Sequence, residues 1–135
     1  MGEKTVYVGL LNFIFDDDIN RTHKQLYETQ RAIKFDELDY NTFALLHEIG
    51  HVMSREKYEN LERAIANSDT AMHNFKINHP YATMQEELEH YMELPLEMDA
   101  DNWAHNYYMN NKEKVLRFQK KYLKTLDKLF KTVLD

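Results

Sequence analysis

The sequence predicts an α+β fold that is mostly α-helical, with a small N-terminal sheet, a central helix that carries the motif HExxH, and several long C-terminal helices. Three observations lead to this prediction. The 135 residues include only three Gly and two Pro, so few breaks interrupt the chain and its elements are long. A β-branched and aromatic run near the N-terminus is typical of a strand. The C-terminal end repeats apolar residues at helical spacing. The length fits one domain, 1–135.

The N-terminal elements follow from local composition. Residues 4–15, KTVYVGLLNFIF, predict the first strand. The acids of the following DDDIN favour the start of a helix with a partial apolar stripe. Residues 32–38, AIKFDEL, predict a second, short strand. Either Asp39 or Asn41 then caps a helix that runs to about Ser54.

The C-terminal elements are predicted to be helices. Residues 56–77 have a helical pattern that ends near Pro80. Residues 82–109 are helical again, and Pro95 forces a start, a stop or a kink there. The last helix, about 112–133, has lysines on one face and an apolar stripe on the other. That stripe consists of Val115, Phe118, Tyr122, Leu126, Leu129 and Val133.

Composition excludes several classes of protein. The chain has no cysteine, so it has neither disulfides nor thiolate ligands, and a transition metal would have to bind imidazole and carboxylate groups. No apolar run approaches 18 residues, and the apolar segment near the N-terminus lacks a cleavage site and is followed by three acids. We therefore expect a cytoplasmic protein that makes no contact with a membrane.

Charge is unevenly distributed along the chain. The net charge is −6, yet residues 112–135 contain eight Lys/Arg and three Asp/Glu, a local charge of +5, which leaves −11 on the rest. An acidic body repels nucleic acid, so we expect no direct nucleic-acid partner. The basic C-terminal helix either packs on its own domain or docks an acidic partner, and the sequence leaves this open.

The sequence HEIGH, which begins at His47, carries the chemistry. On a helix, His47 and His51 project from one face about 6 Å apart, and both imidazoles can reach one Zn²⁺. Glu48 is rotated by about 100° and can act as a general base on a water molecule at the metal. Gly50 allows another part of the backbone to approach closely. The pattern predicts two metal ligands and one base.

A third ligand is expected from LEMDADNWA, residues 96–104. Glu97 begins a helical turn just after Pro95, and Asp101 lies one turn later on the same face. Glu97 can therefore bind the metal while Asp101 accepts a hydrogen bond from the outer nitrogen of a ligand histidine. The nearby acids could replace Glu97 as the ligand, and they are Glu86, Glu87, Glu89 and Glu93.

HEIGH followed by E-x-x-A-D-x-x-A resembles the zinc metallopeptidases of the ImmA/IrrE type, within the wider group of gluzincins. The resemblance covers about a quarter of the chain and includes the lead-in NTFALLHEIGH. It implies a zinc peptidase that cuts a regulatory protein. The 45 residues between His51 and Glu97 are more than a compact member would have, and no helix-turn-helix domain is recognisable.

A residue that stabilises a developing oxyanion would complete a peptidase site. His105 lies one turn beyond Asp101 and is the candidate for this role, with Tyr107 and Tyr108 as alternatives. The leading interpretation is thus a zinc-dependent peptidase that acts on a protein or peptide substrate, with Glu48 as base. The alternatives are a non-catalytic, metal-stabilised interaction protein of a phage or mobile element, and an acidic mimic of nucleic acid.

Overall fold

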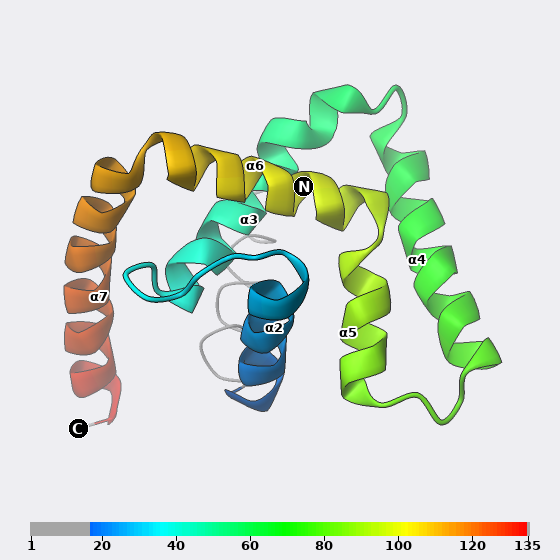
Figure 1. The fold of residues 1–135 in the computed structure, drawn as a ribbon, viewed down its shortest axis with the longest axis horizontal. Helices are drawn as coiled ribbons and strands as arrows, with labels where there is room; N and C mark the ends of the chain where they lie inside the picture. The colour runs from blue at the N-terminus through cyan, green and yellow to red at the C-terminus, as the bar shows by residue number, and fades with distance from the viewer. Residues whose placement is uncertain (1–16, 135) are drawn as a thin grey trace.

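A computed structural model describes residues 17–134, and this part of the chain is built from helices (Figure 1). α6 lies across α3, the hairpin of α4 and α5 stands at one end, and α7 stands at the other (Figure 1). In chain order the elements are α2 (Asp17–Gln30), α3 (Tyr40–Ser54), the short 3₁₀ helix η1 (Arg55–Lys57), α4 (Leu61–Asn78), α5 (Met84–Met92), α6 (Pro95–Asn110) and α7 (Lys112–Leu134).

The predicted α+β class is wrong, because the described residues contain no strand and no sheet. The second predicted strand, residues 32–38, is a loop. Its buried side chains, Ile33 and Leu38, anchor the loop in the core, and no described strand lies beside it to pair with. The amide of Ile33 donates instead to the carbonyl of Tyr27 near the end of α2, at 3.2 Å. The first predicted strand, residues 4–15, lies outside the described residues.

The starts of the helices follow from capping chemistry. Asp39, rather than Asn41, caps α3, and its side chain accepts from the amide of Asn41 at 2.9 Å. Pro95 is the first residue of α6, where a missing N–H leaves no bond unmade. The predicted helix over 82–109 is therefore two helices, α5 and α6. The pattern over 56–77 corresponds to η1 and α4.

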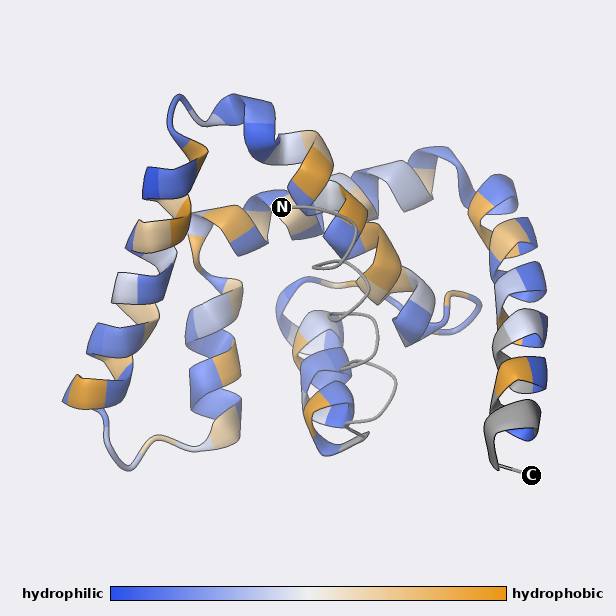
Figure 2. Cartoon of the chain, turned by 180° about the vertical axis from the view of Figure 1, so that it is seen from behind, coloured by the Kyte–Doolittle hydropathy of each residue, from blue (hydrophilic) through white to orange (hydrophobic). Residues whose placement is uncertain are grey.

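α7 packs on the domain through only part of its predicted apolar stripe. Val115 is buried, and the side chain of Gln119 accepts from the amide of Asp39 at 2.7 Å. Phe118 and Leu129 are 48% and 56% exposed, and Figure 2 shows apolar bands along the helix. The stripe residues whose side chains lie outside the description are Leu126 and Val133.

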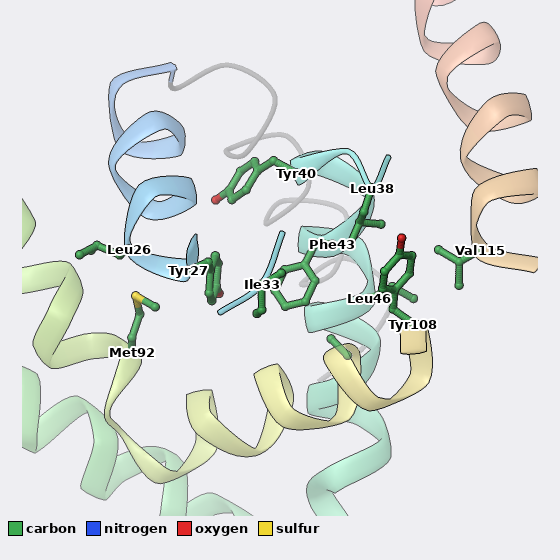
Figure 3. Packing of buried hydrophobic residues seen from close by; sticks show 11 residues of the cluster. Leu26, Tyr27, Ile33, Leu38, Tyr40, Phe43, Leu46, Met92, Tyr108 and Val115 are labelled. Atoms are coloured by element: carbon green, nitrogen blue, oxygen red, sulfur yellow. The ribbon is translucent and has the colours of Figure 1, made fainter. Parts of the chain in front are cut away.

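The hydrophobic core lies between α2, α3 and α6, and its edges reach α5 and α7 (Figure 3). Phe43 at its centre is fully buried, and its ring packs edge to face on Tyr27 with the ring centroids 5.0 Å apart. None of the described helices combines the length and the apolar content needed to cross a bilayer. The core residues are Leu26, Tyr27, Ile33, Leu38, Tyr40, Phe43, Leu46, Met92, Ala104, Tyr108 and Val115.

α3 and α6 make the most extensive contact between any two described helices, and small residues allow it. A Cβ added at Gly50 would lie 2.5 Å from the carbonyl oxygen of Ala100. Ala100 and Ala104 are themselves completely buried. The predicted close approach at Gly50 is therefore confirmed, and the two helices that carry the candidate ligands meet backbone to backbone.

We expect Gly50→Ala to destabilise the fold and to weaken metal binding. Alanine gains about 1 kcal/mol of helix propensity. Overpacking typically costs about 1–3 kcal/mol, and here the obstacle is backbone that cannot rotate away. Chemical denaturation measures the change, with Val52→Ala at a position 40% exposed on the same helix as the control. A variant as stable as the wild type would show that α3 and α6 can separate without penalty.

Candidate metal centre

Three side chains from α3 and α6 converge on one point. The Nε2 atom of His47 lies 2.8 Å from Oε2 of Glu97, and Nε2 of His51 lies 3.2 Å from the same oxygen. One potential ligand atom from each of the three residues falls within 4.8 Å of the others. His47 and Glu97 are buried and His51 is half-buried. This group can hold a metal ion.

The donor set suits a tetrahedral ion. Zinc binds imidazole nitrogen and carboxylate oxygen at about 2.0–2.2 Å, so two ligand atoms in a tetrahedron lie about 3.3 Å apart. The distances of 2.8 Å and 3.2 Å need only a small expansion to reach that value. Two imidazoles and one carboxylate also form a common protein ligand set for zinc. The residues therefore fit the expected ion, although their geometry does not identify the metal.

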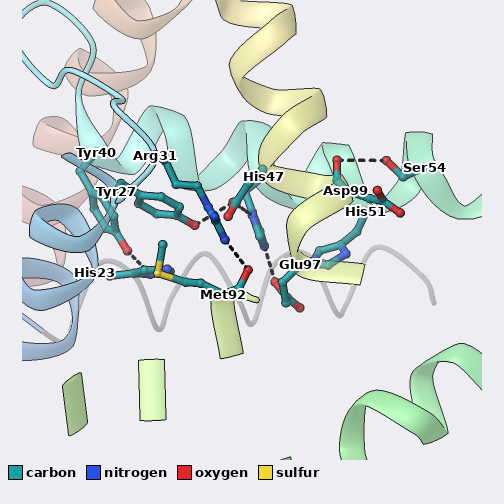
Figure 4. Close-up of polar contacts among 11 residues, drawn as sticks. His23, Tyr27, Arg31, Tyr40, His47, His51, Ser54, Met92, Glu97 and Asp99 are labelled. Carbon is teal, nitrogen blue, oxygen red and sulfur yellow. Dashed lines mark hydrogen bonds and ion pairs between the residues drawn. The ribbon is translucent and has the colours of Figure 1, made fainter. Parts of the chain in front are cut away.

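A buried chain of hydrogen bonds orients His47 (Figure 4). Its Nδ1 donates to Oδ1 of Asp101 at 2.6 Å, which leaves Nε2 to face Glu97 and His51. The hydroxyl of Tyr27 donates to the same oxygen of Asp101 at 2.8 Å. Asp101 therefore accepts a hydrogen bond from the outer nitrogen of a candidate ligand histidine, as predicted. It also accepts a second hydrogen bond, from Tyr27, that was not predicted. Tyr27 and Asp101 are both nearly inaccessible to water.

A second aromatic layer supports Tyr27 from α2 and α3. The ring of His23 stacks on Tyr27 with centroids 4.4 Å apart, and its Nδ1 lies 3.0 Å from the hydroxyl of Tyr40. Burial lowers the pKa of His23 to about 4, so His23 is neutral at pH 7. His23 and Tyr40 therefore pack aromatic rings, without adding a charge, beside the hydrogen bonds that run from Tyr27 through Asp101 to His47.

The two ligands with strongly shifted pKa values form an ion pair in the metal-free chain. Burial opposes a charge on His47, but the hydrogen bonds and charges of Asp101 and Glu97 outweigh it and raise its pKa to about 10. Burial also opposes the charge on Glu97, yet His47 and His51 hold its pKa well below the usual range. The proton on Nε2 of His47 is therefore bound to the nitrogen that would coordinate a metal ion, and it must leave before the metal can bind.

Glu48 and Tyr91 face the same cavity as the metal group. A cavity of about 260 Å³ is lined by Glu48, His51 and Glu97 together with Tyr91 from the last turn of α5. Burial, reinforced by the charge of Glu97, raises the pKa of Glu48 against the opposing influence of the two histidines. Burial and then Glu97 raise the pKa of Tyr91 above its ordinary value, so it remains a proton donor. The base predicted at Glu48 therefore has access to a space beside the metal group.

Bonds outside the ligand set hold the first turns of α6 in place. Tyr58, which follows η1, donates to Oδ2 of Asp99 at 2.5 Å. Ser54 at the end of α3 donates to the Asp99 carbonyl at 3.5 Å. Arg31 at the end of α2 donates to the carbonyl of Met92, just before α6, at 2.8 Å. These contacts fix the turn that carries Glu97.

Other predicted residues lie elsewhere. His105 is half-buried on α6 and does not line the cavity that Glu48 and Glu97 share. Tyr107 lines a groove between α3, α6 and α7, and Tyr108 belongs to the core. The acids considered as substitutes for Glu97 do not join the metal group, and they are Glu86, Glu87, Glu89 and Glu93.

Sequence reasoning missed Tyr27, Tyr91 and the wall that α4 contributes to the cavity. Tyr27 lies 74 positions from Asp101, and no local pattern connects them. Tyr91 occupies a single position on a short acidic helix, without a motif. The pattern over residues 56–77 predicted a helix, but helical spacing of apolar residues is the same for a core face and for the wall of a cavity.

No protein-family model, curated protein or solved structure matches this chain. The likeness to ImmA/IrrE-type peptidases therefore rests on HEIGH and the following E-x-x-A-D, and it stays a prediction. The metal group itself rests on geometry, because residues 46 positions apart meet in a buried cluster.

Tyr27→Phe should lower the affinity for a metal ion, tested with Zn²⁺, although its hydroxyl bonds to Asp101 and not to a candidate ligand. Loss of a direct partner of a ligand histidine usually costs about 10–100-fold, so removal of the hydroxyl behind that partner should cost about threefold to tenfold. Tyr40→Phe is the matched control, because it removes a buried hydroxyl that bonds to His23 instead. Competition with a chelating dye measures both affinities. Equal effects of the two substitutions would show that the Tyr27 hydroxyl contributes only to general stability.

Zinc affinity and metal-free stability should change with pH in opposite directions. The folded pKa of His47, about 10, lies above its unfolded value of 6.5. Its stabilising proton is therefore fully present below pH 6.5 and is lost as the pH rises toward 10. A metal ion bound to this group must displace that proton, so the apparent affinity for added Zn²⁺ should rise by up to about tenfold per pH unit over this window. Thermal unfolding of stripped and zinc-loaded protein at pH 6, 7.5 and 9 tests both trends, and a zinc affinity that does not vary with pH contradicts them.

Proposed function

We propose that this protein is a zinc-dependent peptidase. The observation that carries the proposal is that a group of three potential ligands, His47, His51 and Glu97, borders a cavity that also contains Glu48. Catalytic zinc sites use three protein ligands and keep one position for water or substrate, whereas structural sites use four. A site built only for stability would have no need of a carboxylate such as Glu48 beside it.

His47, His51 and Glu97 would hold the zinc, and Asp101 would keep Nε2 of His47 directed at it. When bound, zinc supplies a Lewis acid that polarises a carbonyl group and acidifies water. Glu48, which lines the cavity beside His51 and Glu97, would take a proton from the attacking water and deliver it to the leaving amine. Burial raises its pKa, which is the direction that makes a carboxylate a stronger base toward water.

Tyr91 takes the role for which sequence analysis favoured His105. Its phenol lines the cavity with Glu48 and His51 and stays protonated. Such a donor can stabilise negative charge that develops on a carbonyl oxygen. The resemblance to ImmA/IrrE-type peptidases supports a regulatory protein as the substrate. The competing proposal, a metal-stabilised interaction protein of a phage or mobile element, needs the same three ligands but no function for Glu48.

Glu48→Gln should keep zinc and fold and lose hydrolysis. The amide has nearly the same shape but cannot accept the proton, so we expect a loss of about 10²–10⁴-fold. The assay incubates zinc-loaded protein with a degenerate mixture of synthetic peptides and detects new termini by mass spectrometry. Glu93→Gln is the control, because it makes the same chemical change at an exposed residue that lies outside the metal group.

Three outcomes distinguish the proposals. Cleavage that depends on zinc and on Glu48 but not on Glu93 supports the peptidase. Cleavage that survives in Glu48→Gln removes the assignment of the base. Tight zinc binding that stabilises the fold, with no cleavage of the peptide mixture or of protein substrates, favours the non-catalytic alternative.

A further inference from the structure

α4 is an 18-residue helix that contributes no fully buried residue to the core. Four of its seven half-buried residues nevertheless form one stripe, with spacings of four, three and four positions. All members of this stripe line the cavity beside the metal group, and they are Leu61, Ile65, Ser68 and Met72. These four side chains therefore face the cavity, whereas Phe75, near the end of α4, stacks on His90 of α5 with ring centroids 4.3 Å apart.

The opposite side of that space belongs to the candidate metal centre. Glu48 and His51 come from α3, and Glu97 comes from α6. Tyr91, Leu94 and Leu96 complete the lining around the end of α5 and the start of α6. Figure 1 shows the hairpin of α4 and α5 beside the beginning of α6, where Glu97 is located. An occupant of the cavity would thus touch apolar α4 on one side and the metal group on the other.

We propose that this cavity is a subsite for one uncharged aliphatic side chain of a peptide bound at the metal centre. The inference rests on the proposed peptidase function and specifies its substrate. Leu61, Ile65 and Met72 are half-buried and line the cavity, and an aliphatic side chain bound there would cover them. Asp69 also lines the cavity and, together with Glu48, disfavours an acidic side chain.

Size restricts the occupant to about one side chain. The cavity has a volume of about 260 Å³, whereas pockets for drug-sized ligands span about 300–1,000 Å³. A peptide would therefore place a single residue between α4 and the metal group, and its backbone would continue outward. Selection by this subsite acts next to the bond that Glu48 would help to break.

Two small probes isolate the side chain from the rest of a substrate. Glycine hydroxamate and leucine hydroxamate share the metal-binding group and differ in the isobutyl side chain of leucine. Isothermal titration of zinc-loaded protein should show leucine hydroxamate binding at least about tenfold more tightly, since burying a leucine side chain is worth about 1.5–3 kcal/mol. The metal content of the protein is measured after each titration to exclude removal of zinc.

Ile65→Phe should remove this preference by filling the cavity. Leucine hydroxamate should lose its advantage to within about twofold, while glycine hydroxamate binds as it does to the wild type. Ile77→Phe is the matched control, because Ile77 is 62% exposed on the same helix and does not line the cavity. Ile65→Ser is a second variant, which keeps the space open and should weaken leucine hydroxamate selectively.

The result separates the subsite from the peptidase proposal. Equal affinities of the two hydroxamates for the wild type, or an effect of Ile77→Phe as large as that of Ile65→Phe, would overturn the subsite and leave the peptidase proposal intact. Failure of both hydroxamates to bind zinc-loaded protein would show a metal closed to ligands. That outcome would overturn the peptidase proposal and the subsite with it.

Discussion

The contact between Gly50 and the carbonyl of Ala100 is the constraint on which the site depends. It lets α3 and α6 cross at backbone distance, and only at that distance do His47 and His51 reach Glu97 and Asp101. A larger residue at position 50 would separate the helices at the level of the ligands. The HEIGH sequence therefore supplies two candidate ligands, His47 and His51, and also the glycine that lets α6 approach them.

The same crossing creates a costly arrangement of buried charge. Glu97 and Asp101 are both buried, and protonated His47 lies between them and directs one ring N–H at an oxygen of each carboxylate. Removing one partner from such a set leaves an uncompensated charge in a medium that solvates it poorly. The arrangement is most useful where a cation replaces the proton, so the electrostatics and the ligand geometry both favour a metal site.

Sequence predicted well those features that are set by near neighbours. Local chemistry narrowed the cap of α3 to Asp39 or Asn41 and placed a break at Pro95, and the spacing of His47 to His51 put two candidate ligands on one face. The loop at residues 32–38 was predicted to be a strand because its buried apolar residues are of the types that strands also contain. Only the absence of a pairing strand beside it, among the residues that the structure describes, distinguishes the two structures. Tyr27 was missed because its role depends on contacts between α2 and α6, which no spacing along the chain encodes.

α4 differs from α3 and α6 in how it is held, since none of its side chains is fully buried. Regions with few buried apolar contacts open at lower free energy than the core, in units that unfold separately. Backbone amides of α4 should therefore exchange with solvent deuterium well before those of α3 and α6. Transient detachment of α4 would then widen the space beside His51 and Glu97, while the helices that carry the candidate ligands stay packed together.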